Sequence, residues 1–103
     1  LYALGPLLAR LRTLRKDDPE VACRALLAKA QARGRTRGAS DAWGEAVDAC
    51  AKSEGLVSAL FHGGRAALRE KKTKEAETRF ARLEATFPRH RLADDARFYR
   101  ATM

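Results

Sequence analysis

Apolar residues recur along this sequence at intervals of three and four, and no stretch alternates apolar and polar residues as a strand would. Alanine is abundant and β-branched residues are few, which favours helices over strands. Proline, glycine and capping residues interrupt the pattern repeatedly and divide it into segments. The sequence therefore predicts an all-α fold of about six helices.

The expected helices cover residues 6–16, 19–33, 41–53, 56–71, 74–87 and a final stretch from about residue 92. Pro19 stands at a tolerated first-turn position after the capping residue Asp18. Pro88 ends the fifth segment, because proline cannot continue a helix. Most connections are short, so consecutive helices should pack as antiparallel neighbours. We expect helical hairpins that follow one another in a row.

Composition narrows the class of protein. The 103 residues suit a single small domain, and 46% hydrophobic with 33% charged residues is enough to build a core rather than a disordered chain. No run approaches the roughly 18 apolar residues that a membrane span needs. The sequence begins at Leu1 and stops at Met103 inside an expected helix, so we expect residues 1–103 to be one segment of a longer polypeptide.

The chain is strongly basic, with 21 Lys and Arg against 13 Asp and Glu and a net charge of +8. A surface rich in arginine could bind the phosphates of a nucleic acid. The basic residues are spread over all the expected helices, however, and no aromatic residues interleave with them as a single-strand platform requires. A nucleic-acid binder is therefore the third hypothesis, with residues 33–37 as its best argument.

One segment, residues 57–90, has the spacing of a helical-hairpin repeat. Gly64 and Ala67 are small where one helix must let the next approach closely. The repeat positions are Leu60, Gly64, Ala67, Ala76, Phe80, Leu83 and Pro88. In these positions the segment resembles the tetratricopeptide repeat, although Leu60 stands where that family prefers Trp and Gly63 where it prefers Leu. The resemblance implies a right-handed α-solenoid of helix hairpins; an ordinary helical bundle is the alternative.

A narrower resemblance lies in residues 87–96, FPRHRLADDA. This phrase is similar to the degenerate repeats of bacterial cell-envelope proteins, in particular the superhelix of soluble lytic murein transglycosylases. The resemblance implies a non-catalytic segment, a periplasmic location and a parent chain that cleaves peptidoglycan. A tetratricopeptide-like scaffold for protein–protein interaction, with no enzymatic parent, is the alternative.

Catalytic motifs are missing from the sequence, which has no HExxH, GxSxG, P-loop or GxGxxG pattern. His62 has no evident partner, and Asp94 and Asp95 fit the first turn of a helix, where the dipole favours acidic residues. Nothing matches the catalytic motifs of the transglycosylase domain either. We therefore expect no catalytic residue, no cofactor and no metal site in this segment.

A binding surface follows from the repeat geometry, in which the first helix of each pair lines a concave groove. The outward positions place Ser58, Arg65 and Arg69 in this groove, joined by Arg97 from the last helix. A basic groove suits peptidoglycan or an acidic peptide or protein segment. The alternative is that these arginines only keep the surface soluble.

The two cysteines, Cys23 and Cys50, stand at nearly equal distances from the turn between the second and third expected helices. At 1.5 Å per residue their heights nearly coincide, and both fall on apolar faces, so we predict that they lie close together. In an oxidising compartment they could form a disulfide worth about 2–4 kcal/mol. The alternative is a pair of small buried apolar side chains.

Overall fold

The computed structural model describes residues 18–103 and has five helices there. They are α2 (Pro19–Arg33), α3 (Ala39–Ala49), α4 (Leu56–Arg69), α5 (Thr73–Thr86) and α6 (Arg91–Thr102). No strand occurs in this part of the chain, so the all-α prediction is confirmed. The helix expected at 6–16 lies outside the described residues, which leaves five helices rather than about six.

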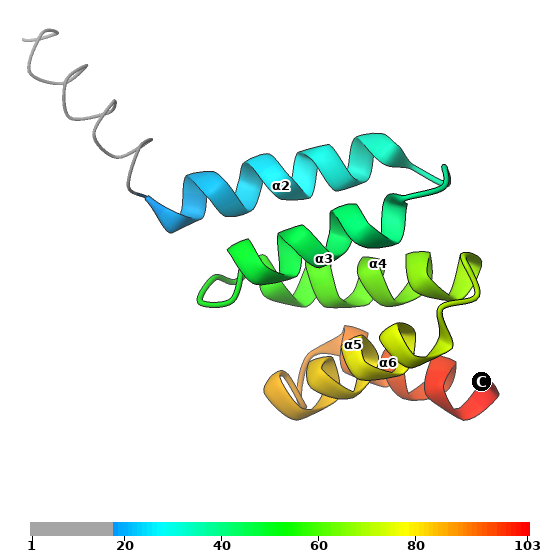
Figure 1. The fold of residues 1–103 in the computed structure, drawn as a ribbon. Helices are drawn as coiled ribbons and strands as arrows, with labels where there is room; N and C mark the ends of the chain where they lie inside the picture. The colour runs from blue at the N-terminus through cyan, green and yellow to red at the C-terminus, as the bar shows by residue number, and fades with distance from the viewer. Residues whose placement is uncertain (1–17) are drawn as a thin grey trace, which may run out of the picture.

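Each helix packs against the next one along the chain. Figure 1 shows α2, α3 and α4 following one another across the molecule, with α5 and α6 on the side away from α2. Connections of a few residues join these helices, and each turn reverses the direction of the chain. None of the helices within residues 18–103 is both long enough and apolar enough to cross a membrane.

Two helices end earlier than the sequence predicts, and local hydrogen bonds give the reason. After α3, Ser53 N donates to Cys50 O at 2.9 Å and the Ser53 hydroxyl accepts from Gly55 N at 3.0 Å, so residues 50–55 form a turn. After α4, Lys71 adopts a left-handed conformation (φ 61°) and Lys72 N donates to Ala67 O at 2.8 Å. This is the Schellman arrangement, which closes the helix at Arg69.

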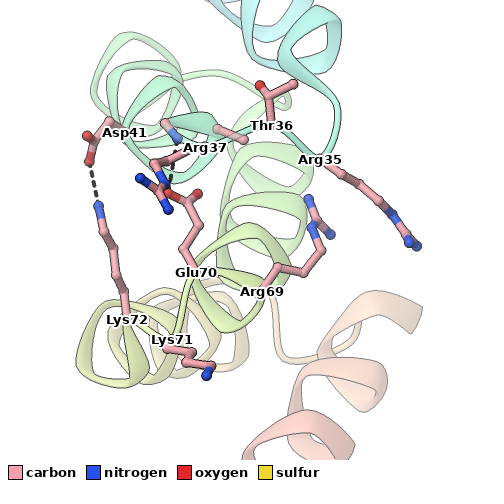
Figure 2. Close-up of a pocket in the computed structure, with 10 residues that line it drawn as sticks. Arg35, Thr36, Arg37, Asp41, Arg69, Glu70, Lys71 and Lys72 are labelled. Carbon is pink, nitrogen blue, oxygen red and sulfur yellow. Dashed lines mark hydrogen bonds and ion pairs between the residues drawn. The ribbon is translucent and has the colours of Figure 1, made fainter.

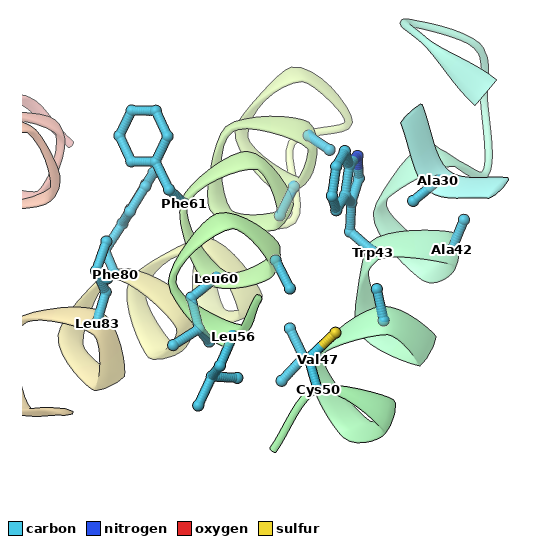
Figure 3. Packing of buried hydrophobic residues seen from close by; sticks show 14 of the residues in the cluster. Ala30, Ala42, Trp43, Val47, Cys50, Leu56, Leu60, Phe61, Phe80 and Leu83 are labelled. Carbon is cyan, nitrogen blue, oxygen red and sulfur yellow. The ribbon is translucent and has the colours of Figure 1, made fainter. Parts of the chain in front are cut away.

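The core is continuous and draws residues from all five helices. Figure 3 shows that α4 carries core residues on two sides, facing Trp43 and Val47 of α3 on one and Phe80 and Leu83 of α5 on the other. The repeat positions Leu60, Gly64, Ala67, Ala76, Phe80 and Leu83 are all buried, whereas Pro88 is exposed just after α5 ends. Packing on both faces of α4 leaves a third face open to solvent.

Candidate binding groove along α4

The open face of α4 carries a stripe of polar residues. Ser58, His62, Arg65 and Arg69 are separated by four, three and four positions, which places them on one side of the helix. The structure has three hollows along this stripe, of about 190, 250 and 280 Å3. Neighbouring hollows share lining residues, so they form one continuous depression, the α4 groove.

Neighbouring helices supply the sides of the α4 groove. Gln31 contributes from α2, Trp43 from α3 and Tyr99 from α6. The Trp43 ring is almost fully buried, and its centroid lies 5.5 Å from that of His62. The groove therefore has an aromatic lining as well as a basic one.

Arg65 is held over two aromatic rings. Its guanidinium carbon lies 5.9 Å from the ring centroid of Phe61 and 5.9 Å from that of Tyr99, a distance that suits a cation–π interaction. Tyr99 is in turn stacked on the buried ring of Phe80, with centroids 5.4 Å apart and planes inclined by 6°. The stacked rings fix the side of the groove against which Arg65 lies.

Three arginines in this groove have no carboxylate partner among the described residues. Within residues 18–103, Arg35, Arg65 and Arg69 have no Asp or Glu oxygen within 4.0 Å. Arg69 makes only a long contact of 3.5 Å to the carbonyl oxygen of Gly34. Cations without an internal partner are available to an anionic ligand.

His62 has a lowered pKa. The first cause is partial desolvation of the imidazole, which lies between the rings of Trp43 and Phe61, and the second is the positive charge of Arg65 and then of Arg69. Each of these causes disfavours the imidazolium form. At neutral pH the His62 ring is therefore an uncharged hydrogen-bonding group in the middle of a cationic stripe.

The structure brings together three of the four groove residues expected from the sequence. Ser58, Arg65 and Arg69 line the α4 groove, but Arg97 lines none of its three hollows. Arg97 instead pairs with Glu84 of α5 at 3.6 Å and with Asp94. Its guanidinium therefore holds α6 against α5.

Five groove residues are not marked as such by the sequence: His62, Trp43, Gln31, Arg35 and Tyr99. His62 was recoverable, because it continues the helical stripe that contains Ser58 and Arg65. The other four come from different helices and from a turn, and only the packing of α2, α3 and α6 brings them to α4.

A polar cluster lies where α3, α4 and α5 meet. Arg79 of α5 donates to Ser40 Oγ and to Gly63 O, both at 2.9 Å, and only 13% of its side chain is exposed. A Cβ at Gly44 would lie 2.9 Å from Arg79 Nη2, and one at Gly63 would lie 3.3 Å from its Cδ. Arg79 thus fills a slot between two glycines and ties α3, α4 and α5 together.

The two cysteines line none of the groove hollows and lie where α2 meets the end of α3. Cys23 and Cys50 are buried and joined by a disulfide, with their Cα atoms 4.7 Å apart. Gly55 packs against both sulfur atoms, since a Cβ there would lie 2.7 Å from Cys23 Sγ. The disulfide thus links α2 to the end of α3, and Gly55, just before α4, packs on it.

Within residues 18–103 no group of three or more His, Cys, Asp or Glu side chains is arranged to hold a metal ion. The α4 groove is therefore described by its arginines, its neutral histidine and its aromatic lining. No family model, curated protein sequence or solved structure matches the chain.

Proposed function

We propose that this chain is a non-catalytic helical-repeat segment that binds an acidic, carboxylate-bearing chain along the α4 groove. One observation carries the proposal: a straight stripe of Ser58, His62, Arg65 and Arg69 lies in a continuous depression whose arginines have no carboxylate partner in the described part of the chain. An extended chain with spaced carboxylates would follow such a stripe, and each guanidinium can donate paired hydrogen bonds to one of these carboxylates.

The repeat architecture that we propose is a tetratricopeptide-like solenoid. The hairpin α2–α3 is followed by the hairpin α4–α5, and α6 then opens a third. Two observations support this arrangement: α4 touches α6 as well as α5, and the Phe61 and Tyr99 rings of α4 and α6 lie 5.9 Å apart. Contact between first helices of successive hairpins is what stacking of repeats requires. The α4 groove is then the concave face.

The compartment and parent protein that we propose are those of a cell envelope. The Cys23–Cys50 disulfide supports an oxidising compartment such as the periplasm. Together with the FPRHRLADDA phrase, the disulfide favours a soluble lytic murein transglycosylase as the parent protein, with this chain as part of its superhelix. Peptidoglycan, whose peptide stems carry carboxylates, is then the first ligand to test. An acidic protein segment bound by a scaffold without an enzymatic parent is the second.

The single tryptophan provides a direct test, because Trp43 lines the groove. We expect its fluorescence to change on titration with a peptide rich in Glu and Asp, and not with the matched Gln and Asn peptide. Soluble peptidoglycan fragments form a second arm that separates the two ligands. Replacing Arg65 and Arg69 by Ser should weaken binding by about tenfold or more.

A matched control comes from two exposed arginines outside the groove, Arg82 and Arg91. The Arg82→Ser/Arg91→Ser variant loses the same net charge and should bind within about twofold of the parent. Equal weakening in both double variants would show that only net charge matters and would refute the groove. Tighter binding of an oligonucleotide, falling steeply between roughly 50 and 200 mM salt, would favour the nucleic-acid hypothesis instead.

A further inference from the structure

A larger cavity, of about 610 Å3, lies at one end of the molecule, where the α2–α3 turn meets the α4–α5 turn (Figure 2). Its lining comes from residues 35–39 and 41 on one side and 69–72 on the other. We call it the turn cavity. It shares Arg35 and Arg69 with the α4 groove, whereas Arg37 and Lys71 belong to the turn cavity alone.

The turn cavity is electropositive. Five basic side chains and two carboxylates line it, which leaves a net charge of three positive units. The basic residues are Arg35, Arg37, Arg69, Lys71 and Lys72. This charge is concentrated around one hollow.

Both carboxylates of the turn cavity are already engaged. Asp41 pairs with Lys72 at 3.1 Å, and Glu70 accepts from Gly38 N at 3.1 Å and from Ser40 N at 2.6 Å (Figure 2). The Glu70 carboxylate therefore already accepts hydrogen bonds from amides at the N-terminus of α3, so these amides are not available to a ligand. The four other cations have no Asp or Glu oxygen within 4.0 Å in residues 18–103.

Lys71 is placed at the rim by an unusual backbone conformation. It is the one non-glycine residue with a positive φ in the described range, at the helix-ending position where glycine is the usual choice. A lysine there contributes a charge to the cavity at the expense of a relaxed backbone. Backbone strain of this kind is found preferentially where a side chain has a function.

We propose that the turn cavity binds a compact, multiply charged phosphate group, such as a diphosphate or the phosphate-ester end of a larger molecule. Arginine forks match phosphate oxygens in pairs, and lysine binds them as a point charge. A single carboxylate has one negative charge and would leave most of the four free cations without a partner. A diphosphate carries several negative charges in one compact group, and it therefore offers more charge than a carboxylate to the four free cations that line this hollow.

The direct test is a titration of the full chain with pyrophosphate, followed by calorimetry and by amide chemical shifts. We expect saturable binding with shifts concentrated in residues 35–41 and 69–72. Citrate, a polyanion of carboxylates, should bind about tenfold more weakly or worse. Citrate binding as tight as pyrophosphate, or no saturable pyrophosphate binding, would overturn the proposal.

Variants separate this site from net charge and from the α4 groove. Arg37→Ser with Lys71→Gly removes two cavity cations and should weaken pyrophosphate binding by about tenfold or more, while Arg82→Ser/Arg91→Ser should change it by no more than about twofold. Equal weakening in both would refute the site. Arg65→Ser should weaken binding of the acidic peptide and leave pyrophosphate binding unchanged. The α4 groove proposal and the turn cavity proposal can therefore fail independently.

A last arm identifies the source of the phosphate. Vesicles that contain phosphatidic acid present the same group on a lipid surface. We expect free pyrophosphate to bind in the absence of vesicles. Binding to the vesicles alone would show that a membrane surface is recognised and would overturn a site for a compact soluble phosphate.

Discussion

Gly64 of α4 lies directly against the ring of Phe80 of α5. A Cβ at position 64 would sit 2.6 Å from Phe80 Cε1 and 2.7 Å from its Cζ, both shorter than any ordinary carbon contact. The ring has little freedom to move aside, because it is fully buried and stacked on Tyr99. The close approach of α4 and α5 therefore depends on the missing side chain at Gly64.

Gly64→Ala should destabilise the protein by about 1–3 kcal/mol, the usual cost of overpacking a core. The direction is informative, since alanine is favoured over glycine inside a helix by about 1 kcal/mol and would stabilise an uncrowded site. Urea unfolding, followed by the circular dichroism of the helices at roughly 222 nm, measures the change in the free energy of unfolding.

A double-mutant cycle with Phe80→Leu provides the control. Leucine leaves space where the aromatic ring stood, so the effect of Gly64→Ala should be smaller in that background. The coupling between the two positions should amount to about 0.5–3 kcal/mol. Strict additivity would show that Gly64 and Phe80 are not in direct contact.

The sequence was informative about the α4–α5 hairpin because its signals are local. Gly64, Ala67 and Ala76 are small and spaced for close helix packing, and the structure buries all three. The slot that holds Arg79 was not foreseen, because Gly44 and Gly63 lie on different helices and neither predicts a guanidinium between them. The early start of α3 at Ala39 escaped detection for the same reason, since its cap comes from Glu70, thirty residues away.

In the candidate site, too, residues of one helix could be predicted from the sequence, whereas contacts between helices could not. Ser58, Arg65 and Arg69 could be placed on one face from their spacing alone, since they share a helix. Arg97 could not be placed in this way, because its pairing with Glu84 depends on how α6 packs on α5. For the turn cavity, the sequence marked only the basic segment 33–37, because the other half of the lining, residues 69–72, comes from a turn that is distant in the chain.

The disulfide should be detectable in the unfolded, unreduced protein as an absence of reactive thiols. Cys23 and Cys50 are separated by 27 positions, and closing a loop of that length should contribute about 3–4 kcal/mol. Reduction should lower the Tm accordingly. The Cys23→Ser/Cys50→Ser variant should have the same Tm with and without reductant. Two titratable thiols per unreduced chain would contradict the pairing.

Glu70 should make α3 sensitive to acid. Hydrogen bonds from the Ser40 amide first, and then from that of Gly38, help to hold the pKa of this carboxyl below its ordinary value. A lowered folded-state pKa stabilises the protein above the unfolded value, and this contribution is lost as pH falls through the folded value.

Glu70→Ala should cost about 0.5–2 kcal/mol at neutral pH, the range for loss of a helix cap. Glu70→Gln keeps one acceptor oxygen and should cost less, and it should also reduce the loss of stability between neutral and acidic pH. Chemical unfolding at several pH values tests both effects. The exposed Glu54→Gln serves as the control, and an unchanged pH profile in Glu70→Gln would contradict this role.

Lys71→Gly should stabilise the protein by about 1 kcal/mol, because glycine adopts a positive φ without a steric penalty. The Schellman hydrogen bonds, Lys71 N to Leu68 O and Lys72 N to Ala67 O, involve only the backbone and persist in the variant. Lys71→Ala should give no such gain, since alanine meets the same penalty. A Tm that rises equally in both variants would attribute the effect to charge and not to conformation.

His62 should make binding in the α4 groove depend on pH. Because its pKa lies below the ordinary value, the ring is neutral at pH 7 and gains a proton only on acidification below about pH 6.5. The added charge should strengthen binding of an acidic peptide until the peptide carboxylates themselves protonate near about pH 4. The unfolded chain takes up that proton more readily, so stability should fall over the same interval.

Trp43 fluorescence titrations at successive pH values should show the rise in affinity for the parent and a flat profile for His62→Gln. His90→Asn, which keeps a capping acceptor at the start of α6, should retain the rise; loss of the rise in both variants would refute this assignment to His62.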